Sequence, residues 1–178
     1  MTIPMTADQF DVLPEPQAQR YELSRGELVE VPALSPLHNL VRDNLSYCFI
    51  AYRRRQTAGL SLCSSDFALT PDTVRRPDLA FIAADRRSEF PMDQRLRGVP
   101  DIAAEIVSAS ELYDAVLRKV NDYLRAGVKY VWVISLEHRS AVIWTVDAAQ
   151  FVAPHNPLSC PELLPEFSVR MEELFVGA

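Results

Sequence analysis

The sequence predicts a mixed α/β (α+β) domain in which helices flank a central sheet. Helix-like and strand-like patterns alternate along the chain without an internal repeat. Two strand-like runs, 77–83 and 101–107, are apolar on both faces, as expected for central strands covered on each side. The 178 residues, of which 48% are apolar, fit a single domain, 1–178, with a full hydrophobic core.

The first part of the chain combines helices with short strands. Thr6-Ala-Asp-Gln9 forms a capping box, which predicts a short helix through Leu13 that the following prolines stop. Ser35-Pro36 supplies an N-cap and a first helical residue for a longer helix, and Gly59 is expected to end it. Strands are expected at 21–23, at 26–31 with Leu28 half-buried, and at 60–69 as an edge strand.

The remaining part alternates strands and helices more regularly. A helix is expected at 111–126, closed by Gly127 in the position where a left-handed cap is needed. The other elements expected here are strands at 77–83, 101–107, 129–136 and 140–146, a loop at 84–100, and a loop with a short helix at 161–175.

Composition excludes several classes of protein. The formal net charge of -6 means that any contact with nucleic acid must come from a local patch or a bound metal ion. The three cysteines show no CxxC spacing, which favours free thiols in a reducing compartment over a structural zinc site. The sequence begins without a secretory signal pattern and contains no apolar run near the ~18 residues of a membrane span. We therefore expect a cytoplasmic protein with no membrane partner.

Two acidic residues stand beside apolar strand sequences. Glu105 lies in Ile102-Ala-Ala-Glu-Ile-Val107, where burying a carboxylate is costly unless a cation or hydrogen-bond donors meet it. Asp78 begins the comparable run after Arg75-Arg76-Pro77. Each acid could instead form a structural ion pair with an arginine, and Asp78 could also cap a turn. Together, they could bind one divalent cation, and oxygen ligands favour Mg²⁺ or Mn²⁺ over zinc.

Lys119 completes this group. At about 100° per residue, it falls at the edge of the apolar stripe of the predicted helix 111–126. The alternative is that its stem is buried and its ammonium reaches water near Asp122. Phosphodiester hydrolysis needs a metal ion held by carboxylates and a cation beside the attacking water, so Asp78, Glu105 and Lys119 are the predicted catalytic residues.

Two further residues are weaker candidates. Glu22, near the expected start of the sheet, could be a third acid. His38, in the first turn of its helix, could contact phosphate, although a local hydrogen bond is the simpler interpretation. The other acids of this region, Glu27, Glu30 and Asp66, are interpreted as residues of the sheet surface.

Several motifs resemble the Uma family of putative restriction endonucleases, which is similar to the PD-(D/E)xK nuclease superfamily. The resemblance runs from about Phe10 to Phe175. Its motifs are Tyr21-Glu-Leu, Gly26-Glu-Leu-Val, Ser35-Pro with His38, Arg75-Arg-Pro-Asp78, Pro100-Asp with Glu105-Ile-Val-Ser, Lys119 with Tyr123-Leu-Arg-Ala-Gly-Val128 and Trp132, and Leu164-Pro with Phe167.

This resemblance implies a restriction-endonuclease-like fold and specific roles for the site residues. Asp78 and Glu105 match the two acids of the superfamily motif, with a carbonyl near Ile106 as a further metal ligand. The superfamily lysine usually stands two residues after the second acid, where this chain has Val107, and Lys119 matches a lysine moved to the following helix. Glu22 and His38 match an acid and a histidine that recur in the family.

The resulting hypothesis is a Mg²⁺- or Mn²⁺-dependent DNA endonuclease, for which a homodimer is plausible because duplex cleavage needs two sites. The arginine-rich loop from Arg86 to Arg97 is the expected substrate contact. Two alternatives remain open at this stage. One is a catalytically silent binding or regulatory protein, and the other is a metal-free hydrolase in which Asp78 and Glu105 act as general acid and base.

Overall fold

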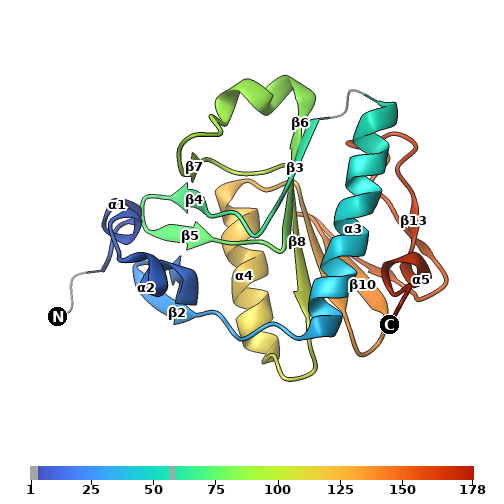
Figure 1. Ribbon diagram of the computed structural model, residues 1–178, viewed down its shortest axis with the longest axis horizontal. Coiled ribbons are helices and arrows are strands. Elements are labelled where there is room, and N and C mark those ends of the chain that lie inside the picture. The colour runs from blue at the N-terminus through green and yellow to red at the C-terminus, as the bar shows by residue number, and fades with distance from the viewer. Residues whose placement is uncertain (1–3, 57–58) are drawn as a thin grey trace.

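The computed structural model describes residues 4–56 and 59–178, in which two mixed sheets and a two-stranded antiparallel sheet are surrounded by helices (Figure 1). The larger sheet has the strand order β11-β10-β9-β8-β6-β3, and the smaller has the order β2-β1-β5-β4-β7. This mixed α/β arrangement confirms the predicted fold class.

The strands of the larger sheet are β3 (Gly59–Cys63), β6 (Leu79–Ala83), β8 (Ile102–Val107), β9 (Tyr130–Ser135), β10 (Ser140–Trp144) and β11 (Ala149–Val152). Those of the smaller sheet are β1 (Tyr21–Ser24), β2 (Glu27–Glu30), β4 (Phe67–Thr70), β5 (Thr73–Arg75) and β7 (Leu96–Arg97), and a separate pair consists of β12 (Pro157–Leu158) and β13 (Val169–Arg170). The helices are α1 (Ala7–Asp11), α2 (Glu15–Arg20), α3 (Pro36–Arg55), α4 (Tyr113–Ala126), α5 (Met171–Leu174) and the 3-10 helix η1 (Ala84–Glu89).

Strand β8 divides the core into two layers. Its side chains alternate between faces, so Ile102, Ala104 and Ile106 belong to the cluster that packs under α3. Ala103 belongs to the opposite cluster, which includes Val120 of α4. Figure 1 shows α3 and α4 on opposite sides of β6 and β8, with α1, α2 and β2 beyond α4. The same alternation directs Glu105 toward α4.

The predicted N-cap of α3 and the predicted left-handed C-terminal cap of α4 are confirmed. The Ser35 hydroxyl accepts a hydrogen bond from the His38 amide at 3.1 Å, and Pro36 occupies the first turn of α3. Helix α4 ends at Gly127, whose φ of 103° gives the left-handed cap expected there. No helix within the described ranges is both long and apolar enough to cross a membrane.

Other boundaries differ from the predictions. Helix α3 ends at Arg55, and Gly59 begins β3 instead of ending the helix. The expected edge strand at 60–69 is two strands, because Ser64 has a φ of 47° and the chain turns into the smaller sheet. Leu28 is 41% exposed, because it lies on the outer strand β2.

Several short elements were not predicted. Helix α2 begins directly after Pro14, because a proline such as Pro16 is compatible with the first turn of a helix, where no amide donor is needed. The remaining unpredicted elements are β5, η1, β7 and β11–β13, all of them only two to six residues long.

Asp101 connects β6 to the start of β8 and β9. Its buried carboxylate accepts a hydrogen bond from the Ala83 amide at 2.9 Å and pairs with Lys129 at 2.8 Å and Arg86 at 3.2 Å. Burial acts to raise the pKa of Asp101, but these hydrogen bonds and charges outweigh it and lower that pKa.

Asp101→Asn is expected to reduce the free energy of unfolding at pH 7 by about 2 kcal/mol, because charge-assisted hydrogen bonds are lost. The lowered folded-state pKa stabilises the wild type above the unfolded-state pKa, and this contribution is lost as pH falls through the folded-state value. Urea unfolding from pH 7 downward should therefore show the two proteins converging in acid. Asp147→Asn, at an exposed turn, is the matched control and should not change stability.

Candidate active site

A pocket of about 550 Å³ opens at the end of the larger sheet where β6 begins and β8 ends. It contains the three predicted catalytic residues, Asp78, Glu105 and Lys119. Ile106 and His38, also expected at the site, line the same pocket. Its other lining residues are Gln19, Arg20, Glu30, Val31, Pro32, Ala33, Leu34, Ser64, Arg76 and Glu111.

Asp78 is held at the pocket by β8 and α3. Its Oδ2 accepts a 2.7 Å hydrogen bond from the Ile106 amide and lies 3.1 Å from Nε2 of His38. Within residues 4–56 and 59–178, no hydrogen bond reaches the other carboxylate oxygen, Oδ1. His38 is buried, and its Nδ1 has no partner in the same described ranges. The simple local hydrogen bond expected of His38 is thus made by its backbone, while its ring faces Asp78.

The register of β8 orients the Ile106 carbonyl. The carbonyl of Val107 accepts a hydrogen bond from the Leu136 amide, on the β9 side, at 3.0 Å. Because strand residues alternate between the two edges, the Ile106 amide and carbonyl both face the opposite edge, where Asp78 lies. β6 pairs with β8 only as far as Ala104, so no residue of β6 donates a ladder hydrogen bond to the Ile106 carbonyl.

Glu105 is bound by two residues one turn apart on α4. Its Oε2 accepts a hydrogen bond from Lys119 Nζ at 2.8 Å, and its Oε1 accepts one from the Tyr123 hydroxyl at 2.6 Å. Burial raises the pKa of Glu105, and Lys119 opposes this rise while Asp78 and Glu22 add to it. The pKa of Lys119 is raised, because the charges of Glu105 and Glu22 outweigh the effect of burial, so the amine stays protonated.

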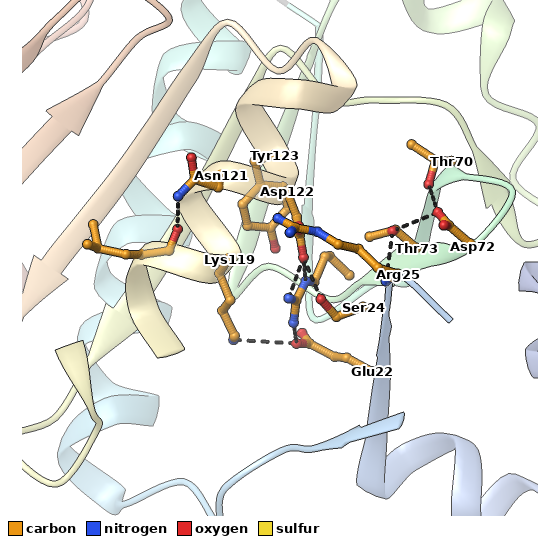
Figure 2. Close-up of polar contacts among 12 residues, drawn as sticks. Glu22, Ser24, Arg25, Thr70, Asp72, Thr73, Lys119, Asn121, Asp122 and Tyr123 are labelled. Atoms are coloured by element: carbon orange, nitrogen blue, oxygen red, sulfur yellow. Dashed lines mark hydrogen bonds and ion pairs between the residues drawn. The ribbon is translucent and has the colours of Figure 1, made fainter. Parts of the chain in front are cut away.

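Beside this pair lies a second buried network, centred on Arg75. Arg75 of β5 donates to Glu22 of β1 at 2.7 Å and to Asp122 of α4 at 2.6 Å. Asp122 also accepts hydrogen bonds from Ser24 at 2.8 Å and from Arg25 at 2.9 Å (Figure 2). The network joins the smaller sheet to the helix that carries Lys119.

Glu22 belongs to this network and does not line the pocket. Its two oxygens accept from the Arg76 amide at 2.9 Å and from Arg75 at 2.7 Å, and it is 3.7 Å from Lys119. Figure 2 shows Glu22 facing the Lys119 ammonium. Glu22 therefore adds negative charge next to the Lys119 ammonium, and it meets the predicted site through this lysine and not as a residue of the pocket lining.

The arginines of the loop 86–97 are paired with other groups of the same chain, partly at its surface. Arg86 pairs with Glu89 and Asp101, Arg95 pairs with Asp11, and Arg97 pairs with Asp8 and Asp11. Arg87 donates to the Phe90 carbonyl. These contacts count against the prediction that the loop is a free basic surface for substrate.

The oxygen atoms of the pocket suit a hard cation. Within the described ranges, no group of three or more His, Cys, Asp or Glu side chains is arranged to hold a metal ion. The available donors are the Asp78 and Glu105 carboxylates and the Ile106 carbonyl. Mg²⁺ is commonly held by one or two carboxylates and several waters, so this donor set fits Mg²⁺ or Mn²⁺.

Three residues around the site were not predicted: Arg75, Asp122 and Tyr123. Asp122 and Tyr123 follow Lys119 at the spacing of one helical turn, so all three can face the sheet together. For Asp122 and Tyr123, this helical spacing was the signal available in the sequence. It does not reveal their partners, which lie 18 to 98 residues away along the chain.

Known proteins provide both a family and a related fold for this chain. The family profile described as "Uma2: Putative restriction endonuclease" matches residues 7–172, and the chain belongs to this family. The chain is also similar to a solved structure described as "a putative nuclease belonging to DUF820 from Anabaena variabilis ATCC 29413". The two share 17% identity and a TM-score of 0.81, over 97% of this chain and 98% of the other, so the two chains have the same fold. No curated protein matches the chain.

Tyr123→Phe is expected to lower the free energy of unfolding by about 2 kcal/mol, because it removes a buried hydrogen bond to a carboxylate. The measurement is urea unfolding at neutral pH. Tyr113→Phe is the matched control, since Tyr113 lies on the same helix and is 71% exposed. An equal effect of the two substitutions would contradict the role of the Tyr123 hydroxyl.

Arg75→Met is expected to cost about 3–5 kcal/mol of stability, because it removes the one buried cation that Glu22 and Asp122 share. Arg20→Met removes an exposed pair with Glu30 and should leave stability unchanged. The variants can be compared by thermal and urea unfolding. A stable Arg75→Met protein would show that the two acids can be accommodated without the guanidinium.

Proposed function

We propose that this protein is a metal-dependent endonuclease that hydrolyses phosphodiester bonds in DNA. The observation that carries the proposal is the convergence of Asp78, Glu105 and Lys119 on one pocket, from two strands and a helix. A nuclease-like fold and membership of the family support the same reaction class. Mg²⁺ or Mn²⁺ is the proposed cofactor.

The proposed metal ligands are Asp78, Glu105 and the carbonyl of Ile106. A bound divalent cation would polarise the phosphate and lower the pKa of a bound water. The Ile106 amide fixes Asp78 through Oδ2, so Oδ1 can serve as a ligand without breaking that hydrogen bond. Glu105 would have to share or exchange its contact with Lys119, because both of its oxygens already accept hydrogen bonds.

Lys119 is assigned a positioning and electrostatic role. Its raised pKa keeps it protonated, so it is unsuited to act as a general base. The ammonium can orient the attacking water and offset the charge that develops on the phosphate oxygens as the P–O bond breaks. His38, beside Asp78, is proposed to orient this carboxylate, with contact to phosphate as its weaker alternative role.

Glu22 is proposed to act through Lys119. Its Oε2 lies 3.7 Å from the ammonium and helps to raise the lysine pKa.

A homodimer is part of the proposal, because cutting both strands of a duplex requires two sites. The second candidate function, a silent nucleic-acid-binding or regulatory protein, is favoured by the net charge of -6 and by the internal pairing of the loop arginines.

Cleavage of supercoiled plasmid tests the proposal. The wild type is expected to cut DNA with Mg²⁺ or Mn²⁺ and to stop when EDTA is added. Asp78→Ala, Glu105→Ala and Lys119→Ala should each reduce the rate at least about 100-fold, because each removes a ligand or a charge needed in the transition state.

Arg118→Ala is the matched control for Lys119→Ala, since it removes an exposed cation from the same helix outside the pocket. Binding of Mn²⁺ can be followed by electron paramagnetic resonance, and it should weaken in Asp78→Ala and persist in Arg118→Ala. Cleavage that survives both Asp78→Ala and Lys119→Ala would reject the assignment. Folded wild type that binds DNA without cleaving it would favour the silent binding protein.

A further inference from the structure

An uncharged, apolar segment forms one wall of the pocket. Val31-Pro-Ala-Leu34 follows β2 and leads into α3, and all four of its residues line the pocket. In Figure 1 this connection runs from the smaller sheet to the start of α3, past the end of the larger sheet. Leu34 is 44% exposed, so its side chain is available to a ligand.

The same pocket is also lined by Asp78, Glu105 and Lys119. A phosphate group can be bound there without any help from an apolar surface. Matched duplex DNA presents mainly phosphate and sugar to an approaching protein, while the faces of its bases are stacked inside. The part of a nucleic acid that fits an apolar wall beside a phosphate site is therefore an unstacked base.

The charges around the pocket do not favour a long duplex. Its cations are each paired with an acid: Arg20 with Glu30 at 2.9 Å, Arg76 with Asp66 at 2.7 Å, and Lys119 with Glu105 at 2.8 Å. Proteins that follow a duplex backbone use a series of free cations. A local contact with one nucleotide requires fewer of them, and the volume of about 550 Å³ lies within the usual range for small-molecule pockets.

We propose that the segment 31–34 receives the base of an unpaired nucleotide next to the scissile phosphate. The preferred substrate is then single-stranded or locally unpaired nucleic acid, and Leu34 is a specificity-determining residue. This inference rests on the proposed function, because the acids and the lysine of the pocket supply the phosphate site.

The test uses three DNA probes of one sequence: a single strand, a duplex with one unpaired nucleotide, and a matched duplex. Phosphorothioate linkages prevent cleavage, and 2-aminopurine marks the unpaired position. With Mg²⁺ present, we expect tighter binding of the two unpaired probes and a change in 2-aminopurine emission. Leu34→Ser should weaken their binding about tenfold, because an apolar contact of a few carbon atoms is lost, and should not affect the matched duplex.

Leu28→Ser is the matched control. Leu28 is 41% exposed on β2, similar to Leu34, but it does not line the pocket. It should leave all three affinities unchanged, and thermal unfolding should show that both variants remain folded. Equal binding of paired and unpaired probes, an equal loss for all three in Leu34→Ser, or an effect of Leu34→Ser on self-association alone would overturn the inference.

Cleavage of unmodified probes separates this inference from the proposed function. Efficient cutting of the matched duplex that Leu34→Ser does not alter would overturn the inference and retain the nuclease. Leu34-dependent binding of unpaired DNA, without cleavage in any metal, would retain the inference about the ligand and reject the nuclease.

Discussion

The burial of Glu105 between β8 and α4 is the constraint on which the site depends. A carboxylate inside two packed layers must be met by a cation and by donors, or its burial would cost more than the fold can supply. Lys119 and Tyr123 meet this requirement from successive turns of α4. The strand position of the acid therefore determines which face of the helix must pack against the sheet.

Arg75 extends this constraint to the smaller sheet. Strand β5 has only three residues, yet its arginine contacts acids on β1 and α4 at once. Asp122, one of these acids, follows Lys119 on the same helix. The smaller sheet thereby restricts the rotation of α4 as well as its distance from β8. Ion pairs link Glu105, through Lys119, to the network of Glu22, Arg75 and Asp122, and so connect the larger sheet with the smaller one.

The three residues that converge on the pocket could be singled out from local sequence patterns. Glu105 stands among apolar neighbours, Asp78 begins an apolar run, and Lys119 lies at the edge of an apolar helical stripe. Asp122 and Tyr123 stand out only by their spacing from Lys119, and Arg75 stands in a run of arginines, so their partners are revealed only by three-dimensional contacts. The same reasoning explains the fold: α3 and α4 are long enough to show helical periodicity, and β6 and β8 are continuous apolar runs, whereas α2, β5, β7 and β11 are too short to show a pattern.

The location of the lysine on a helix has a mechanical consequence. On the strand, two residues after Glu105, its distance from the acid would be set by backbone geometry alone, but Val107 stands there. On α4, the distance between Lys119 and Glu105 changes whenever the whole helix slides along the sheet or rotates about its axis. Lys119, Asp122 and Tyr123 must then shift together. Substitutions at packing positions outside the site, such as Val128, can therefore change the distances within the site while the residues of the site stay the same.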